Sequence, residues 1–287
     1  MLKVALSING TGKKSLDREC LSAMKAAGIE AVEISLGRDL SLSLDYTKLA
    51  EEATAAGMEL WSFHLPFMPF DEIDVSATDE EVRKFSVAMC ADMIKRGSAI
   101  GIKKFVIHPS GEPIDESDRP ARMAAAKVSL AELCEVADES GAVLCVENLP
   151  RTCLGRDSSD ILELLSADSR LRACFDTNHL LCEEIRDFIR AVGNKIATVH
   201  VSDYDGLNER HWLAGEGCID WQSLYSELLS TGYAGAWLYE LNLEATPTII
   251  RPRDLTFSDF VRNAEEILSG RAPTPVGVPA PDLVGWK

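Results

Sequence analysis

Residues 173–179 read Ala-Cys-Phe-Asp-Thr-Asn-His, a short apolar run that stops at a carboxylate and is followed by an imidazole. The run 171–175 predicts a buried strand, which places Asp176 at the strand end and His179 in the turn after it. Five other predicted strands end on the same kinds of side chain: His64, His108, Glu147, His200 and Glu240. A buried strand rarely closes on an unpaired polar group, because burying such a group is costly. The six strand ends therefore predict one shared site.

The same order of elements repeats about eight times along the chain: a short apolar strand, a loop, a helix and a glycine. The strands are apolar on both faces, as parallel strands covered by helices are. They are expected at 2–7, 29–35, 59–63, 104–107, 142–146, 171–175, 196–199 and 236–239. Helices are expected near 15–27, 45–56, 78–100, 119–140, 159–167, 182–192, 220–231 and 256–269. Eight such units predict an α/β fold, a (β/α)8 TIM barrel; a doubly wound open sheet is the alternative, disfavoured because no Gly-x-Gly-x-x-Gly follows a strand.

We expect one barrel domain over residues 1–270, because the composition does not change along these units. A proline-rich tail follows over residues 271–287, with four prolines and two glycines after residue 271. Such a segment is extended and either wraps the barrel or reaches a neighbouring subunit, so a homo-oligomer is one expectation.

Two helix starts carry recognisable signals. Thr78, with Glu81 three residues later, predicts a capping box at the start of one helix. Asp220 is expected to be the N-cap of the helix that begins at Trp221.

The chain is strongly acidic, with 46 Asp and Glu against 29 Lys and Arg and a net charge of −17. Such a chain repels DNA unless one face gathers the basic residues, and no run of Lys or Arg does so, which disfavours a nucleic-acid partner. No apolar run approaches the about 18–20 residues of a membrane span. The N-terminus enters a predicted strand rather than a signal peptide. Eight cysteines without a Cys-x-x-Cys pair predict reduced thiols. We therefore expect a cytoplasmic protein.

All five histidines of the chain fall at the predicted site: His64, His108, His179, His200 and His211. Four carboxylates join them: Glu147, Asp176, Glu209 and Glu240. Packed together without a cation, these acids would repel one another and some would stay protonated. A divalent metal removes this conflict, and mixed imidazole and carboxylate ligands suit Mn²⁺, Zn²⁺, Co²⁺ or Fe²⁺. The sequence thus predicts a divalent-metal cofactor, with Mn²⁺ or Zn²⁺ first and Co²⁺ or Mg²⁺ as alternatives.

The chain resembles the xylose isomerase-like TIM barrel superfamily in element order over about residues 1–270. That group includes the sugar phosphate isomerases/epimerases and the abasic-site nucleases of the endonuclease IV type (AP endonuclease family 2). The resemblance is carried by five stretches, which contain His108, Glu147, Asp176 with His179, His200, and His211 followed by 212–221.

The two branches of this superfamily imply different metal sites. The epimerase branch implies one metal held by Glu147, Asp176, His200 and Glu240, with His179 contacting the substrate. The nuclease branch implies three zinc ions, with His64 and His108 joining Glu147, and His179 grouped with an Asp-x-His pair. That pair is here Glu209-Arg210-His211, so a glutamate replaces the aspartate. Epimerases of free ketoses carry an arginine shortly after the seventh-strand histidine, and Arg210 is the nearest candidate, at a larger offset.

We expect a metal-dependent isomerase or epimerase of a small sugar or sugar phosphate, with a role in carbohydrate metabolism. Glu147 and Glu240 would exchange a proton with the substrate through an enediolate. A related sugar or polyol dehydratase needs the same groups. The alternative is an endonuclease IV-like zinc phosphodiesterase acting on abasic DNA, which the net charge and Glu209 disfavour. A non-catalytic binding barrel is disfavoured by the intact acid-rich site.

The apolar stretch 66–70 could form a lid wall, and Arg151 could meet a substrate phosphate, although surface arginines are commoner.

Overall fold

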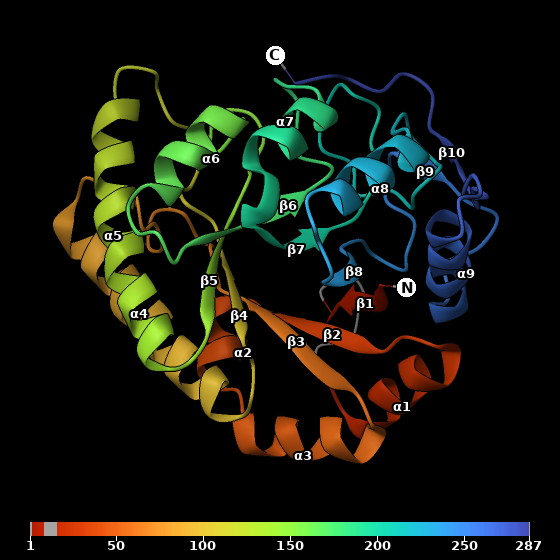
Figure 1. The fold of residues 1–287 in the computed structure, drawn as a ribbon, viewed down its shortest axis with the longest axis horizontal. Helices are drawn as coiled ribbons and strands as arrows, with labels where there is room; N and C mark the ends of the chain where they lie inside the picture. The colour runs from red at the N-terminus through yellow and green to blue at the C-terminus, as the bar shows by residue number, and fades with distance from the viewer. Residues whose placement is uncertain (1, 9–15, 287) are drawn as a thin grey trace.

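The computed structural model describes residues 2–8 and 16–286, in which eight parallel strands are surrounded by helices (Figure 1). The strands are β1 Lys3–Ser7, β2 Ala31–Ser35, β3 Glu59–His64, β4 Lys104–Ile107, β5 Val143–Glu147, β6 Arg172–Asp176, β7 Ile196–His200 and β8 Ala236–Tyr239. They form one sheet in the order β7-β6-β5-β4-β3-β2-β1-β8. A parallel bridge between Val201 and Tyr239 joins the two edges. The predicted TIM barrel and its eight strands are therefore confirmed.

The helices lie outside the sheet and cover it (Figure 1). They are α1 Arg18–Ala27, α2 Arg38–Leu42, α3 Tyr46–Ala56, α4 Glu80–Ala99, α5 Arg119–Glu139, α6 Ser158–Leu165, α7 Ile185–Val192, α8 Trp221–Ser230 and α9 Phe257–Leu268, with a short 3₁₀ turn η2 at Gly193–Lys195. Helices α1 and α3 end on Gly28 and Gly57, whose φ angles of 105° and 64° need a residue without a Cβ. The start of the predicted helix at residue 15 lies outside the described residues.

One local prediction is wrong, and some short elements were not predicted. The capping box at Thr78 is wrong, because α4 begins at Glu80 and its N-cap is Asp79, whose side chain accepts from the Glu81 amide at 2.9 Å. The one-turn helix α2 was not predicted from the sequence. Nor was the small antiparallel pair formed by β9 Ile249–Ile250 and β10 Val278–Pro279. The N-cap at Asp220 is confirmed.

The barrel interior is apolar at one end and polar at the other. At the amino ends of the strands, Ala5, Ala31, Ala236 and Leu238 leave room for Trp61. The Trp61 ring N–H donates to the Thr198 hydroxyl at 3.1 Å, and Lys104 Nζ lies 3.5 Å from the ring centroid. The ionisable side chains of the predicted site lie instead at the carboxyl ends of the strands.

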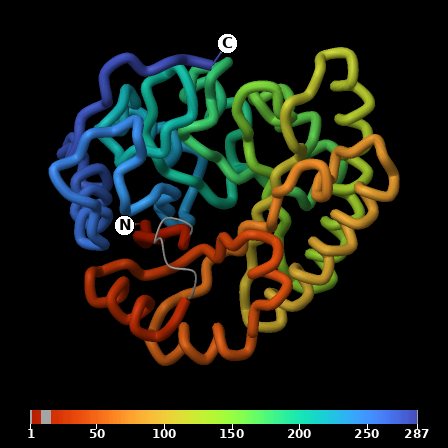
Figure 2. Tube along the Cα trace, turned by 180° about the vertical axis from the view of Figure 1, so that it is seen from behind, coloured from red at the N-terminus to blue at the C-terminus, as the bar shows by residue number. Residues whose placement is uncertain are grey.

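Residues 272–286 lie along the outside of the barrel, seen as the dark blue trace that ends at the C-terminus (Figure 2). The Gly277 amide donates to Glu216 at 2.7 Å, and the Trp286 amide donates to the Leu207 carbonyl at 2.9 Å. Glu216 also forms a buried ion pair with Arg251 at 2.6 Å. The tail thus contacts the loop between β7 and α8. In the described residues, we find no helix with the length and apolar character of a membrane span.

Candidate metal centre

The ionisable side chains predicted from the strand ends meet at one mouth of the barrel. His64, Glu147, Asp176 and His200 are the last residues of β3, β5, β6 and β7. His108 and Glu240 directly follow β4 and β8. Because all eight strands are parallel, their carboxyl ends face the same way, and side chains there can approach across the barrel.

Four of these residues form the innermost group: Glu147, Asp176, His200 and Glu240. Each offers a ligand atom, and these atoms all lie within 4.8 Å of one another. His200 Nδ1 lies 3.0 Å from Glu147 Oε1, 3.0 Å from Glu240 Oε2 and 3.8 Å from Asp176 Oδ2. Glu147, Asp176 and His200 are fully buried, and the Glu240 side chain is 13% exposed. Three carboxylates therefore face one imidazole nitrogen.

The polar atoms of this group fit a divalent cation. Asp176 Oδ1 accepts from the Asn178 amide at 2.6 Å, whereas the buried Oδ2 has no hydrogen-bond partner. Burial raises the pKa of Asp176 to about 7; the negative charges of Glu240 and Glu147 add to this, and His179 opposes it. An unpartnered buried carboxylate oxygen beside two further carboxylates is costly unless a cation binds there. A mixed carboxylate and imidazole set suits Mn²⁺ or Zn²⁺.

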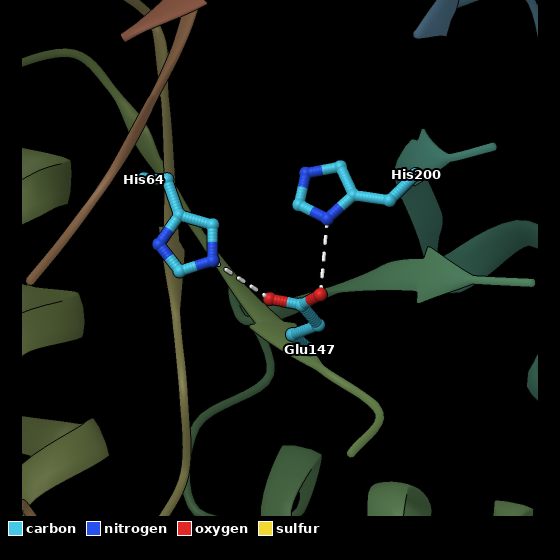
Figure 3. A group of neighbouring side chains, drawn as sticks. All are labelled: His64, Glu147 and His200. Carbon is cyan, nitrogen blue, oxygen red and sulfur yellow. Dashed lines mark hydrogen bonds and ion pairs between the residues drawn. The ribbon is translucent and has the colours of Figure 1, made fainter. Parts of the chain in front are cut away.

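A second group lies on the other side of Glu147. The Glu147 carboxylate bridges two imidazoles, with His200 on one oxygen and His64 on the other (Figure 3). His64 Nε2 and His108 Nε2 lie 3.1 Å and 3.3 Å from Glu147 Oε2. Although burial alone would raise it, the pKa of Glu147 stays well below its usual value because His200, His108 and His64 stabilise the charged form.

The third group contains His179, Glu209 and His211, whose ligand atoms also lie within 4.8 Å of one another. Glu209 Oε1 lies 2.8 Å from His211 Nε2 and 3.6 Å from His179 Nε2. Burial works against protonation of His179, but Asp176 and Glu209 outweigh it and raise its pKa to about 10. Arg210 lines the same cavity, yet its guanidinium pairs with Asp205 at 2.7 Å and donates to the Val284 carbonyl at 2.8 Å.

Glu147 and Glu240 of the innermost group, and the residues of the other two groups, line a cavity of about 420 Å³, which Phe67, Met68 and Phe70 also line. The Phe67 ring stacks on His108, with ring centroids 3.9 Å apart. Arg151 also lines the cavity; it pairs with Glu112 and with Glu209, the latter at 2.8 Å. A larger cavity of about 840 Å³ lies beside α7 and α8, but none of these histidines lines it.

Two residues of the site were missed from sequence. Asn148 follows Glu147, and its amide group brackets the backbone of Asp176: Nδ2 donates to the carbonyl at 2.9 Å, and Oδ1 accepts from the amide N–H at 2.7 Å. Glu33 of β2 is fully buried and hydrogen-bonds His200. Its signal in the sequence was a carboxylate between Val32 and Ile34, two apolar residues of a predicted strand.

Comparison with known proteins identifies the family. The family model described as a xylose isomerase-like TIM barrel matches residues 21–256, which is most of the chain. The chain belongs to the xylose isomerase-like TIM barrel family. The resemblance seen in the sequence is thereby confirmed.

Proteins with different names are similar to this chain. A fructoselysine 3-epimerase of Escherichia coli O157:H7 is 28% identical over 39% of this chain and 43% of its own length. A probable endonuclease 4 of Finegoldia magna is 23% identical over 53% of this chain and 59% of its own. The chain spans less than two thirds of the length of the curated relatives it matches. A solved D-tagatose 3-epimerase-like protein has a TM-score of 0.79, covering 93% of this chain and 97% of that one at 22% identity, which is a likeness of fold.

Proposed function

We propose that this protein is a divalent-metal-dependent isomerase or epimerase of a small sugar or sugar phosphate. The observation that carries the proposal is the buried Asp176 Oδ2, which has no hydrogen-bond partner, within a group of three carboxylates and one imidazole. Two of these carboxylates, Glu147 and Glu240, line a small cavity. The similarity to a fructoselysine 3-epimerase and to a D-tagatose 3-epimerase-like fold supports a sugar substrate.

Glu147, Asp176, His200 and Glu240 would hold the metal. When bound, a divalent cation makes the hydrogen beside a sugar carbonyl more acidic. Glu147 and Glu240 are the acid–base pair of this proposal. Burial would raise the pKa of Glu240, but His200 lowers it to about 2, and the pKa of Glu147 also lies well below its usual value. Both carboxylates are therefore ionised at neutral pH and able to accept a proton.

The remaining groups would bind and enclose the substrate. His179 lies at the cavity wall, held by its Nδ1 contact of 2.9 Å with the Asn148 carbonyl. Its Nε2 side faces Glu209 and is the side available to a sugar hydroxyl. Phe67, Met68 and Phe70 would exclude water from the reacting carbon. A dehydratase acting on the same class of sugar would use the same proton-abstracting carboxylate.

The proposal is tested by isotope exchange. Candidate ketoses and ketose phosphates are equilibrated in D₂O with metal-loaded protein, and the products are analysed by mass spectrometry. Proton transfer predicts deuterium at the carbon beside the carbonyl. A Glu240→Gln variant should lower turnover by about 10²–10⁴-fold, the usual contribution of a general acid or base. Metal content is measured on the same samples. Product without deuterium would argue for hydride transfer, and normal turnover by metal-loaded Glu240→Gln would exclude Glu240 as the base.

A second candidate is a zinc phosphodiesterase of the endonuclease IV type. It is favoured by the two additional groups, His64 and His108 around Glu147, and His179 and His211 around Glu209, which match the sites of a three-metal enzyme. The net charge of −17 opposes it, because phosphate contacts supply most of the affinity for DNA. An abasic-site duplex incubated with protein and zinc or manganese at low salt decides between the two. Efficient incision that is lost in Glu147→Gln would reverse our ranking.

A further inference from the structure

We propose that Glu33 is a positioning residue that determines which nitrogen of His200 faces the candidate metal centre. The inference rests on the proposed metal-dependent function and adds a residue to it. Glu33 lies in the middle of β2 and is fully buried. Its neighbour across the β2–β3 pair is Ser62, whose hydroxyl donates to Glu33 Oε2 at 2.7 Å.

The His200 ring lies between Glu33 and the metal-ligand carboxylates. Its Nε2 is 3.1 Å from Glu33 Oε1 and 3.2 Å from Oε2. Its Nδ1 is 3.0 Å from both Glu147 Oε1 and Glu240 Oε2. The two nitrogens of one imidazole therefore face two separate sets of carboxylates.

This arrangement sets the tautomer that His200 takes when a cation is bound. In the metal-free protein both ring nitrogens face carboxylates, and each makes a favourable contact by carrying a proton. When a cation takes the place of the Nδ1 proton, Glu33 holds the remaining proton on Nε2, which leaves the Nδ1 lone pair for the cation. Without the charge of Glu33, the proton would be drawn to Nδ1 by Glu147 and Glu240, and the lone pair would face away from the site.

A purely space-filling role does not explain a carboxylate at this position. Burying a charge is costly unless it is paired, and an apolar side chain would fill the barrel at lower cost. Within residues 2–8 and 16–286, Glu33 has no ion pair with lysine or arginine, and its recorded partners are His200 and Ser62. The buried Glu216, in contrast, is paired with Arg251.

Three variants test the proposal: Glu33→Gln, Ser62→Ala and the control Glu216→Gln. The affinity of metal-stripped protein for Mn²⁺ and Zn²⁺ is measured by competition with a chromophoric chelator. Glu33→Gln keeps the volume of the side chain but not its charge, and should weaken binding by about 10–100-fold, as loss of an outer-shell partner does. Ser62→Ala should act in the same direction by less. Glu216→Gln removes a buried charge elsewhere and should lower the melting temperature without changing metal affinity.

The His200 proton is followed separately in metal-free protein labelled with ¹⁵N-histidine, with His200→Gln to assign the signals. Wild type should show an Nε2–H proton shifted downfield by its carboxylate partner, and Glu33→Gln should shift or lose it. Equal metal affinity of wild type and Glu33→Gln overturns the proposal. If wild-type protein binds no metal, the proposed function fails. In that case the positioning role of Glu33 is judged from the His200 signals alone, and signals that do not change in Glu33→Gln overturn it. If Glu33→Gln does not fold, the positioning role is overturned when Ser62→Ala binds metal as tightly as wild type.

Discussion

The Glu147 carboxylate is contacted by four imidazoles. His200 and His179 lie 3.0 Å and 3.7 Å from Oε1, and His64 and His108 lie 3.1 Å and 3.3 Å from Oε2. One buried negative charge therefore links the innermost ligand group to the second group. Because its pKa is held well below the usual value, Glu147 is charged at neutral pH. A carboxylate that binds a metal must be ionised in this way.

His200→Ala should reduce the metal content of protein purified without chelator. The His200 side chain belongs to the four-residue group of candidate ligands. Loss of a residue that only contacts a metal ligand weakens metal binding by about 10–100-fold, and loss of His200 should weaken it by at least as much. Metal is measured by elemental analysis, and circular dichroism checks the fold. His211→Ala is the matched comparison: it should retain the metal if one ion is bound, and should lose part of it if three are bound. Equal metal content in wild type and His200→Ala would exclude this ligand assignment.

Metal affinity should rise as the pH rises through about 7. In metal-free protein the pKa of Asp176 is raised to about 7, chiefly by burial. Burial opposes protonation of His200, but Cys174, Glu240, Glu33 and Glu147 outweigh it and raise its pKa well above the usual value. A metal needs ionised carboxylates and neutral imidazoles, so binding near pH 7 must release protons, and alkaline pH removes this cost. Calorimetric titration with Mn²⁺ at pH 7, in buffers of different ionisation enthalpy, measures the release. A binding enthalpy that does not depend on the buffer would contradict the prediction.

At the scale of elements, the sheet positions the residues of the site, and the capping residues determine where the helices begin. Among the described residues, five helices begin with an aspartate whose side chain caps a backbone N–H: Asp17, Asp45, Asp79, Asp157 and Asp220 precede α1, α3, α4, α6 and α8. Such a cap satisfies one of the free amides of the first turn and places negative charge at the positive end of the helix. These caps set where each helix starts, and so how the loop before it leaves the mouth of the barrel.

Asp79→Ala should destabilise the protein by about 0.5–2 kcal/mol, the usual cost of losing an N-cap. Thr78→Ala should have little effect, because the Asp79 carboxylate, not the Thr78 hydroxyl, accepts from the first turn of α4. Urea denaturation measures both variants, and a shift of the midpoint with an unchanged slope reports the change in the free energy of unfolding. If Thr78→Ala proved the more damaging change, the capping box at Thr78 would be right and the N-cap at Asp79 wrong.

At the scale of the whole molecule, the C-terminal segment joins parts of the chain that carry the site. The Gly277 amide binds Glu216, and the Arg210 guanidinium donates to the Val284 carbonyl at 2.8 Å. In the sequence, Arg210 lies between Glu209 and His211, which belong to the third group of the candidate metal centre. The tail therefore contacts the loop that places those two side chains.

Removal of residues 272–287 should lower the melting temperature and loosen this loop. Each lost hydrogen bond is worth about 0.5–1.5 kcal/mol, and the buried pair of Glu216 and Arg251 would be exposed to water. A shorter truncation, of residues 281–287, keeps the Gly277 contact and should cost less. Differential scanning calorimetry measures stability, and hydrogen exchange of residues 204–211 reports loop order. Equal melting temperatures for all three chains would show that the tail does not stabilise the barrel.

Much of the site follows from the sequence because parallel strands obey a simple rule. An imidazole or a carboxylate ends four strands and directly follows two more. The carboxyl ends of barrel strands all face one mouth, so His64, Glu147, Asp176 and His200 could be placed together without coordinates. The pattern that predicts a strand is local, so each strand could be predicted from a few neighbouring residues.

The tertiary structure alone decided which atoms meet. Glu33 and His200 are 167 residues apart and contact each other only because both side chains point into the closed barrel. The tail pairs at β9, although nothing local in either segment specifies that register. Arg210 could be assigned to the substrate from its position, but its guanidinium is paired with Asp205 and Val284. A sequence pattern determines where a side chain leaves the backbone; partners from distant segments, and the cost of burying polar atoms, determine what it binds.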